Sequence, residues 1–364
     1  MTVRPTTWVG LLTLVAVSAG CASLGIGKKS HKEFLAPAER TAAIQRAQVW
    51  HPTRVAAMNL RTGPRGKGAF APGETVTCDY VDDKLGGTSP KFACAVSPGD
   101  VVKVKYGRHN GEVYAGVAAT RLLWALGFGA DAMYPVHVIC RGCPASLAEK
   151  DEAPSNPPRF DVATIERKMS GHNMEAKDGP GWVWPELDQV DPAAGGAPLA
   201  QRDALKLLGV LIQHTDSKME QQRLLCEDEK GHKHDLAKCG TPFMMVHDVG
   251  ETFGTGSQLN RQAVSSVNLA EWINTPVWKD AKRCVGNLTE SQTGTLVNPT
   301  ISEAGRKFLA DRLNALTDRQ LHDLFEVAQF TTRPQADGKP TTIDGWVEAF
   351  KQKRHDITAA SCPS

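Results

Sequence analysis

The sequence has almost no excess of charge of either sign. Its 364 residues include 42 Lys and Arg against 40 Asp and Glu, which gives a formal net charge of +2 at pH 7. A protein that binds nucleic acid or an anionic bilayer through its charge carries a clear excess or patch of basic residues. The balance here gives no electrostatic reason to expect either partner.

Internal repeats and low-complexity tracts are also absent, and nothing suggests a chain that is disordered throughout. Hydrophobic residues make up 41% of the sequence. A chain of this length and composition can bury one large hydrophobic core or two smaller ones.

The apolar run near the N-terminus is too short to cross a membrane as a finished helix. It covers residues 8–17 and is preceded by one positive charge at Arg4. A short apolar run behind a basic residue is typical of a secretory signal. We therefore expect a signal peptide at residues 1–20.

Cys21 directly follows this signal and is a candidate for lipid modification. Ala19 and Gly20 stand before it, and small residues at these places suit the peptidase that cleaves ahead of a lipidated cysteine. Such sites usually carry Leu where this chain has Ser18, and ordinary cleavage after Ala19 is the alternative. A lipidated tether is expected at residues 21–36.

Besides Cys21 there are eight cysteines, and an even number in an exported chain predicts disulfides. Cys140 and Cys143 could form a redox-active pair or, with His137, half of a metal site. No second Cys-x-x-Cys is present to complete a four-ligand zinc site. Three pairs are favoured for the other cysteines, of which the first two close short loops: Cys78–Cys94, Cys226–Cys239 and Cys284–Cys362.

The first half of the chain predicts a small antiparallel sheet and the second half is more helical. Gly and Pro dominate residues 179–198, which suits a boundary between lobes. Apolar spacing and turn residues predict the following elements. Strands or extended segments are expected at residues 55–60, 75–80, 91–96, 101–106, 133–140 and 160–169, and helices at 37–49, 112–126, 199–213, 303–316, 318–330 and 343–357.

A polar motif follows the predicted helix at 199–213. The chain reads H-T-D-S-K-M-E-Q from His214 to Gln221 and then enters an apolar strand. This resembles the catalytic loop of protein kinases, which carry H-R-D-L-x-x-x-N at this place. The resemblance implies that Asp216 is the catalytic Asp and Lys218 the Lys that follows it. Gln221 takes the place of the metal-binding Asn, a departure from the kinase pattern.

A second motif follows the apolar segment 243–246. His247 is followed by Asp248, Val249 and Gly250, which resembles the D-F-G motif of kinases with Val in place of Phe. The resemblance implies that Asp248 aims a magnesium ion at nucleotide phosphates.

Upstream, residues 101–106 alternate as a strand does, which places Lys103 and Lys105 on one face. A kinase holds phosphates with one such lysine and pairs it with a glutamate on the next helix. Lys105 is preferred because it is nearer that helix, with Lys103 as substitute, and Glu112 is the expected partner. The Gly86–Gly87 turn is expected to cover the phosphates, although it lacks the full G-x-G-x-x-G.

Each of these residues also has a purely structural interpretation. Asp248 could form an Asx turn, His214 could cap a helix C-terminus, and the two lysines could be a solvated strand face. Their occurrence together in kinase order favours the functional interpretation.

The layout resembles the atypical kinase fold, as in phosphoinositide kinases and HipA-type toxin kinases, and a family of bacterial envelope lipoproteins for which the family implies a fold but no established substrate. The resemblance covers residues 101–250 in order. It implies an α+β, bilobal fold with a small antiparallel-sheet N-terminal lobe at 37–170, a hinge near 165–169 and a mainly helical C-terminal lobe at 171–364.

These observations predict an exported kinase-like protein that uses ATP or another nucleotide with Mg²⁺ or Mn²⁺ and phosphorylates a hydroxyl acceptor. The alternative is a catalytically inactive binding module or a structural lipoprotein, because a periplasmic domain has little ATP available. We expect the chain in the cell envelope, attached to the membrane by lipid on Cys21 and facing the periplasm or the outside. It would be secreted if Cys21 is not lipidated, and no nucleic-acid partner is expected.

Overall fold

The computed structural model describes residues 1–2, 34–147, 155–177, 179–228, 236–254, 266–288, 294–335 and 337–363. Nearly all of the predicted signal peptide, Cys21 and most of the predicted tether lie outside these residues. The described helices and strands all belong to one compact unit, Glu33–Ser364. Within the described residues, no helix combines the length and the apolar character needed to span a membrane.

Five strands close into a barrel in the order β1-β2-β3-β5-β4. The neighbours β1–β2, β2–β3, β3–β5 and β5–β4 are antiparallel, whereas β1 and β4 run parallel and close the barrel. The prediction of a purely antiparallel sheet is therefore wrong at this seam, because a helical crossover between β3 and β4 allows a parallel pair. The strands are β1 (Glu74–Val81), β2 (Lys91–Ser97), β3 (Asp100–Tyr106), β4 (Ala132–Arg141) and β5 (Arg159–Arg167).

The barrel has its own hydrophobic core. Because successive residues of a strand point to opposite faces, every second side chain of β3 points inward, as Val102, Val104 and Tyr106 do. Phe92, Phe160 and Tyr106 pack ring against ring in this core. The intervening residues of β3, which include Lys103 and Lys105, lie on the outer face.

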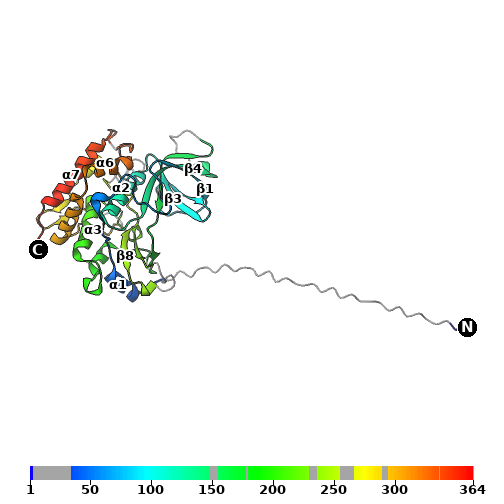
Figure 1. The fold of residues 1–364 in the computed structure, drawn as a ribbon, viewed down its shortest axis with the longest axis horizontal. Coiled ribbons are helices and arrows are strands. Elements are labelled where there is room, and N and C mark those ends of the chain that lie inside the picture. Colours follow the sequence, from blue (N-terminus) through cyan, green and yellow to red (C-terminus); the bar gives the residue numbers. More distant parts are fainter. Residues whose placement is uncertain are drawn as a thin grey trace. The chain divides into compact units, whose positions relative to one another are not determined.

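Helices and a second small sheet surround a larger core. Helix α2 contacts β3, β4 and β5 and also α6, so it lies between the barrel and the C-terminal helices (Figure 1). The α-helices are α1 (Pro37–Arg46), α2 (Gly111–Leu126), α3 (Leu199–Leu211), α4 (Leu269–Asn274), α5 (Glu303–Asn314), α6 (Asp318–Val327) and α7 (Ile343–Ala359) in the described residues.

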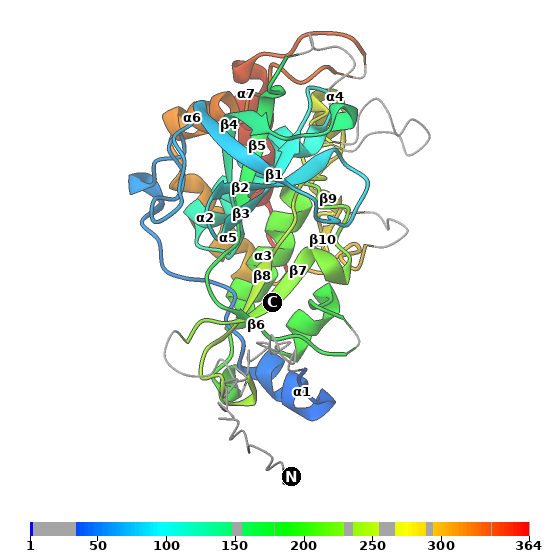
Figure 2. The same ribbon diagram turned by 90° about the vertical axis from the view of Figure 1, so that its right-hand side faces the viewer.

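A three-stranded antiparallel sheet in the order β6-β7-β8 lies beside α3 (Figure 2). It comprises β6 (His172–Asn173), β7 (Gln222–Cys226) and β8 (Pro242–Val246), and a separate pair is formed by β9 (Trp278–Asp280) and β10 (Val285–Gly286). Helix α1 contacts β8 and the 3₁₀ helix Trp184–Gln189. The division into lobes at residue 170 stays a prediction.

Most predicted elements are present, with ends displaced by a few residues. The strand expected at residues 55–60 is wrong, because Val55–Ala57 forms a 3₁₀ helix instead. Only Val55 of this turn is buried. The other two residues of the turn therefore need no neighbouring strand to cover them.

The described part of the chain contains four disulfides, and the three predicted pairs are confirmed. They join Cys78 to Cys94, Cys140 to Cys143, Cys226 to Cys239 and Cys284 to Cys362. The pairing of Cys140 with Cys143 leaves neither thiolate free to bind a metal, which removes the half-site with His137. Disulfides persist in oxidising surroundings, so these four indicate a location outside the cytoplasm.

Candidate functional site

Three lysines share the outer face of the barrel. Strand register places Lys91 of β2 opposite Lys105 of β3, and Lys103 lies on the same face because it is two residues from Lys105. Like charges gathered on one face repel each other unless carboxylates or a bound anion lie close by. The surroundings of these three lysines therefore decide what the face can bind.

Lys105 has carboxylates on two sides. Its Nζ lies 2.7 Å from Glu112 Oε2 and 3.0 Å from each carboxylate oxygen of Asp248, and its side chain is only 1% exposed. Burial alone would lower the pKa of Lys105, but Asp248 and Glu112 raise it above its ordinary value. Burial likewise favours the neutral form of Asp248, yet Lys105 and Lys103 hold the pKa of this carboxyl below its usual range. Lys105 and Asp248 are thus charged at neutral pH.

Helix α2 presents Glu112 from its first turn. Asn110 caps this helix by accepting a hydrogen bond from the Glu112 N–H, so the position of Glu112 follows from where the helix begins. Gly250 lies directly against it, since a Cβ added to Gly250 would come within 2.6 Å of Glu112 Cγ. Glycine at residue 250, two positions after Asp248, therefore allows the loop that follows β8 to approach α2 closely.

The loop after α3 carries Asp216. Lys218 Nζ and Gln221 Nε2 both donate to the Asp216 carboxylate, at 2.9 Å and 2.5 Å. The backbone carbonyl of Gln221 accepts hydrogen bonds from the N–H groups of His247 and Asp248, at 2.7 Å and 3.1 Å. The loop with Asp216 and the loop with Asp248 are thus joined by backbone hydrogen bonds at Gln221.

Asp216 and Asp248 both affect the pKa values of two further side chains, Glu251 and His214. Burial, together with Asp216 and Glu112, raises the pKa of Glu251 to about 7, and Asp248 contributes in the same direction. Burial lowers the pKa of His214 to about 4, and Asp216 and Asp248 oppose this shift. The structure therefore brings Asp216, Asp248 and Glu112 into one electrostatic cluster.

The remaining predicted site residues, Lys103 and the Gly86–Gly87 turn, contact other side chains. Lys103 does not share Lys105's partners but pairs with Glu166 of β5 at 2.6 Å. In the Gly86–Gly87 turn, a Cβ on Gly87 would lie 2.8 Å from Lys91 Nζ, so this turn rests against Lys91.

Sequence reasoning missed three residues of this cluster: Lys91, Glu166 and Glu251. Lys91 bonds only to the Ser89 hydroxyl, at 3.1 Å, among the contacts found in the described part of the chain, and burial lowers its pKa. The alternation of β2 could have placed Lys91 on the outer face. Nothing local marks Glu166 or Glu251, because their surroundings come from distant segments.

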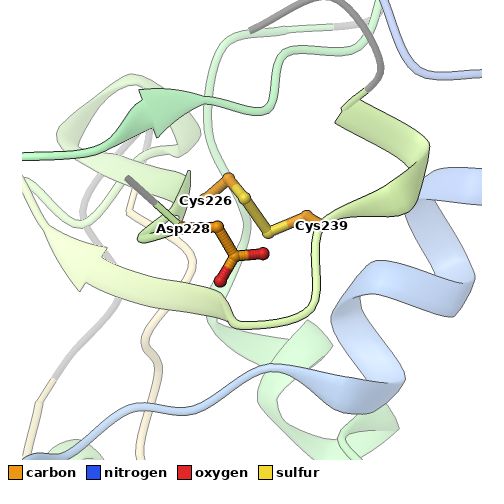
Figure 3. Close-up of side chains that lie close together, drawn as sticks. All are labelled: Cys226, Asp228 and Cys239. Atoms are coloured by element: carbon orange, nitrogen blue, oxygen red, sulfur yellow. A yellow bond between two sulfur atoms is a disulfide. The ribbon is translucent and has the colours of Figure 1, made fainter. Parts of the chain in front are cut away.

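Within the described ranges, two other groups of side chains have the composition of a metal site. Cys226, Asp228 and Cys239 lie together, but the two sulfurs form a disulfide and Asp228 accepts a hydrogen bond from Gly240 N (Figure 3). The second group is Asp131, Glu166 and His247. His247 Nδ1 lies 2.6 Å from Asp131 Oδ2 and Lys103 pairs with Glu166, so the members of this group already have partners.

Asp248, Gln221 and Asp216 offer carboxylate and amide oxygens from adjoining loops. Oxygen ligands are those that Mg²⁺ and Mn²⁺ prefer in proteins. On donor chemistry the residues present fit such an ion, which would take the place of the contacts that Lys105 makes with Asp248 and Lys218 makes with Asp216.

No protein-family model matches the sequence, and no curated protein matches it. Among solved structures, the chain is similar to the crystal structure of a Helicobacter pylori proinflammatory kinase, CtkA, with a TM-score of 0.41 and 10% sequence identity. The match covers 79% of this chain and 95% of that one. The chain is thus distantly similar in structure to a kinase.

Proposed function

We propose that this chain is an exported kinase-like phosphotransferase that moves a phosphoryl group from a nucleotide to a hydroxyl group of an acceptor. The observation that carries the proposal is the buried Lys105 ammonium between Glu112 and Asp248, at 2.7 Å and 3.0 Å. In kinases a strand lysine paired with a helix glutamate positions the nucleotide phosphates, and an aspartate in the loop after a strand holds the metal ion.

In this proposal, the barrel face binds the nucleotide. Lys105 contacts its phosphates while Glu112 fixes the lysine side chain, and Lys103 adds positive charge from the neighbouring position. Lys91, which has no carboxylate partner within ion-pair distance in the described residues, supplies a further cation beneath the Gly86–Gly87 turn. Asp248 and Gln221 would hold Mg²⁺ or Mn²⁺, which neutralises charge on the phosphates.

Asp216 acts on the acceptor. Its carboxylate takes the proton of the acceptor hydroxyl as that oxygen bonds to phosphorus and the bond from phosphorus to the nucleotide's leaving oxygen breaks. Lys218 and Gln221 orient the Asp216 carboxylate through the contacts described above. Phosphoryl transfer depends mostly on such positioning and charge stabilisation.

A binding-only module is the second candidate. Lys218 and Gln221 already donate to Asp216, so both compete with an acceptor hydroxyl for its oxygens. An oxidising compartment also offers little ATP. Such a module would bind a nucleotide without turning it over, and a purely structural envelope lipoprotein would not bind one at all.

A thermal-shift titration tests these candidates. The chain lacking residues 1–21, which keeps every described helix and strand, is titrated with several nucleotides with and without Mg²⁺ or Mn²⁺. Asp248→Asn should abolish metal-dependent binding, because it removes the charged ligand, whereas Asp216→Asn should spare binding and stop turnover. Asp79→Asn is the matched control, since this carboxylate is 58% exposed and pairs with Arg141 on the barrel surface.

The outcomes separate the three candidates. Metal-dependent binding with acceptor phosphorylation that fails in Asp216→Asn supports the phosphotransferase. Binding without turnover under all conditions favours the module. If no nucleotide raises the melting temperature of the wild-type chain, both nucleotide proposals are refuted.

A further inference from the structure

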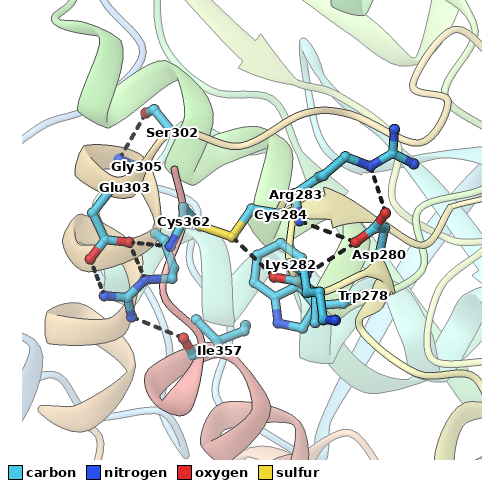
Figure 4. Close-up of a disulfide and its surroundings, with 12 residues drawn as sticks. Trp278, Asp280, Lys282, Arg283, Cys284, Ser302, Glu303, Gly305, Ile357 and Cys362 are labelled. Atoms are coloured by element: carbon cyan, nitrogen blue, oxygen red, sulfur yellow. Dashed lines mark hydrogen bonds and ion pairs between the residues drawn. A yellow bond between two sulfur atoms is a disulfide. The ribbon is translucent and has the colours of Figure 1, made fainter. Parts of the chain in front are cut away.

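A pocket of about 520 Å³ lies away from the barrel face, between the 3₁₀ helix Trp184–Gln189, α3 and the segment before α5. This volume is within the range of small-molecule sites, roughly 300–1,000 Å³. Pro363 and Arg283 belong to its wall. Figure 4 shows Arg283 and Ser302, both from this wall, on either side of the Cys284–Cys362 disulfide, which ties the C-terminal tail to the pocket.

Apolar side chains form much of the wall. Trp184 is buried, whereas Leu199 and Val297 are 45% and 40% exposed. Few large apolar side chains among the described residues are as exposed as these two. Because both line the pocket and are exposed, an apolar ligand body would cover surface that water now contacts.

A single buried cation lies in this apolar wall. The side chain of Lys206 is 8% exposed, and its Nζ lies 2.5 Å from Asp188 Oδ1 and 3.4 Å from Asp203 Oδ1. These two partners differ in burial. Asp203 is 5% exposed and also accepts a hydrogen bond from Ser302 N at 3.0 Å, whereas Asp188 is 62% exposed.

The difference in burial makes Asp188 the replaceable partner. A carboxylate that returns to water regains its hydration, and the pair that Asp188 gives up has one exposed partner, so it contributes less than a fully buried pair. Asp203 cannot leave without removing the partner of a backbone N–H and of a buried ammonium.

We propose that this pocket binds a small carboxylic acid with an apolar body, whose carboxylate replaces Asp188 on Lys206 while the body lies between Trp184, Leu199 and Val297. This proposal is independent of the phosphotransferase proposal, because it uses none of the same side chains. An uncharged amide of the same shape would leave the Lys206–Asp188 pair in place and would gain only the apolar contact.

Isothermal titration of the full-length chain with N-acetyl-leucine and with N-acetyl-leucinamide tests the proposal, since the two probes differ only in the carboxylate. The acid should bind about tenfold or more tightly than the amide, as expected for one buried charged hydrogen bond. Asp188→Asn should preserve or strengthen binding of the acid because it removes the competitor. Val297→Trp should block the opening without changing any charge, and Lys206→Met should abolish the preference for the acid.

Lys307→Met is the control, because this lysine is 66% exposed and lies outside the pocket wall. Equal binding of acid and amide, or no binding of either, would overturn the proposal. The proposal would also fail if the Val297→Trp variant bound the acid as tightly as the wild-type chain does. If Lys206→Met fails to fold, the Asp188→Asn and Val297→Trp variants and the probe pair still decide the question.

Discussion

Lys105 keeps its charge inside the protein because two carboxylates surround its ammonium group. An isolated buried ammonium would lose its proton, and a buried pair is sensitive to the loss of one partner. Glu112 and Asp248 together bring one more negative than positive charge to this point. Lys103 and Lys91 on the same face offset that excess.

Glu251 makes the cluster respond to pH. Its ordinary pKa is 4.5, and burial together with Asp216 and Glu112 raises the pKa to about 7 in the folded protein. The folded state therefore retains a proton that the unfolded state loses, and the stability from this group is lost as pH rises from about 4.5 to about 7.

We predict that Glu251→Gln flattens the fall in the free energy of unfolding across this pH range, because glutamine does not ionise. Denaturant unfolding curves at pH values within and on either side of the window measure it. Glu348→Gln is the control, since Glu348 is 70% exposed. A wild-type slope in the Glu251 variant would show that another group titrates in this range.

At the scale of elements, the loop after β8 and the first turn of α2 pack so closely that only glycine fits at residue 250. A Cβ there would lie 2.6 Å from Glu112 Cγ, 2.9 Å from its Cβ and 3.0 Å from its Cδ. The clash involves the side chain that pairs with Lys105. The spacing between β8 and α2 thus bears directly on the Lys105–Glu112 ion pair.

Gly250→Ala should therefore destabilise the protein by about 1–3 kcal/mol, as expected for overpacking a buried contact, and should weaken nucleotide binding if Lys105 contacts phosphate. Gly86→Ala is the matched control, because a Cβ on Gly86 meets nothing within 4 Å. Urea unfolding of both variants measures the difference. Similar free energies of unfolding would mean that Glu112 moves aside at no cost.

At the scale of the molecule, the disulfides cross-link different kinds of structure. Cys78–Cys94 joins β1 to β2 within the barrel, whereas Cys284–Cys362 spans 78 residues and holds the C-terminal tail. Next to the latter, Glu303 accepts a hydrogen bond from Cys362 N and pairs with Arg306, whose hydrogen bond lowers the pKa of Glu303 to about 2 (Figure 4). The tail is thus held by both a covalent and a polar contact.

Replacing Cys284 and Cys362 by serine should lower the free energy of unfolding by about 4 kcal/mol, because the closed loop is long. The comparison is the Cys140→Ser, Cys143→Ser double variant, whose loop has a separation of 3 and should matter less. Non-reducing denaturant unfolding gives both values. Equal losses would contradict the dependence on loop length, and free thiols detected by mass spectrometry in the folded wild type would contradict full oxidation.

Membrane attachment is a separate prediction for the whole chain. Cys21→Ser should release the protein from membranes into the soluble periplasmic fraction, because a lipid chain supplies the apolar surface that holds the protein there. Fractionation of cells followed by detection of the protein measures it. A substituted protein that stays with the membranes would require another anchor.

Local patterns in the sequence determined much of this protein. The alternation from Val102 to Tyr106 placed Lys103 and Lys105 together on one strand face, since the two-residue period of a strand is a local property. The acid motifs around Asp216 and Asp248 follow a helix and a strand that apolar spacing predicts. Short separations along the chain also favoured two of the disulfide pairs.

Tertiary structure alone decided which distant strands and charged side chains lie together. The parallel seam between β1 and β4, the contact of Asp248 with Lys105, the choice of Glu166 for Lys103, and the cluster around Glu251 all join segments far apart in the sequence. Such contacts depend on how whole elements pack, and no local periodicity encodes them. The pocket beside Lys206 belongs to the same class, because its walls come from segments between residues 184 and 363 that only the folded chain brings together.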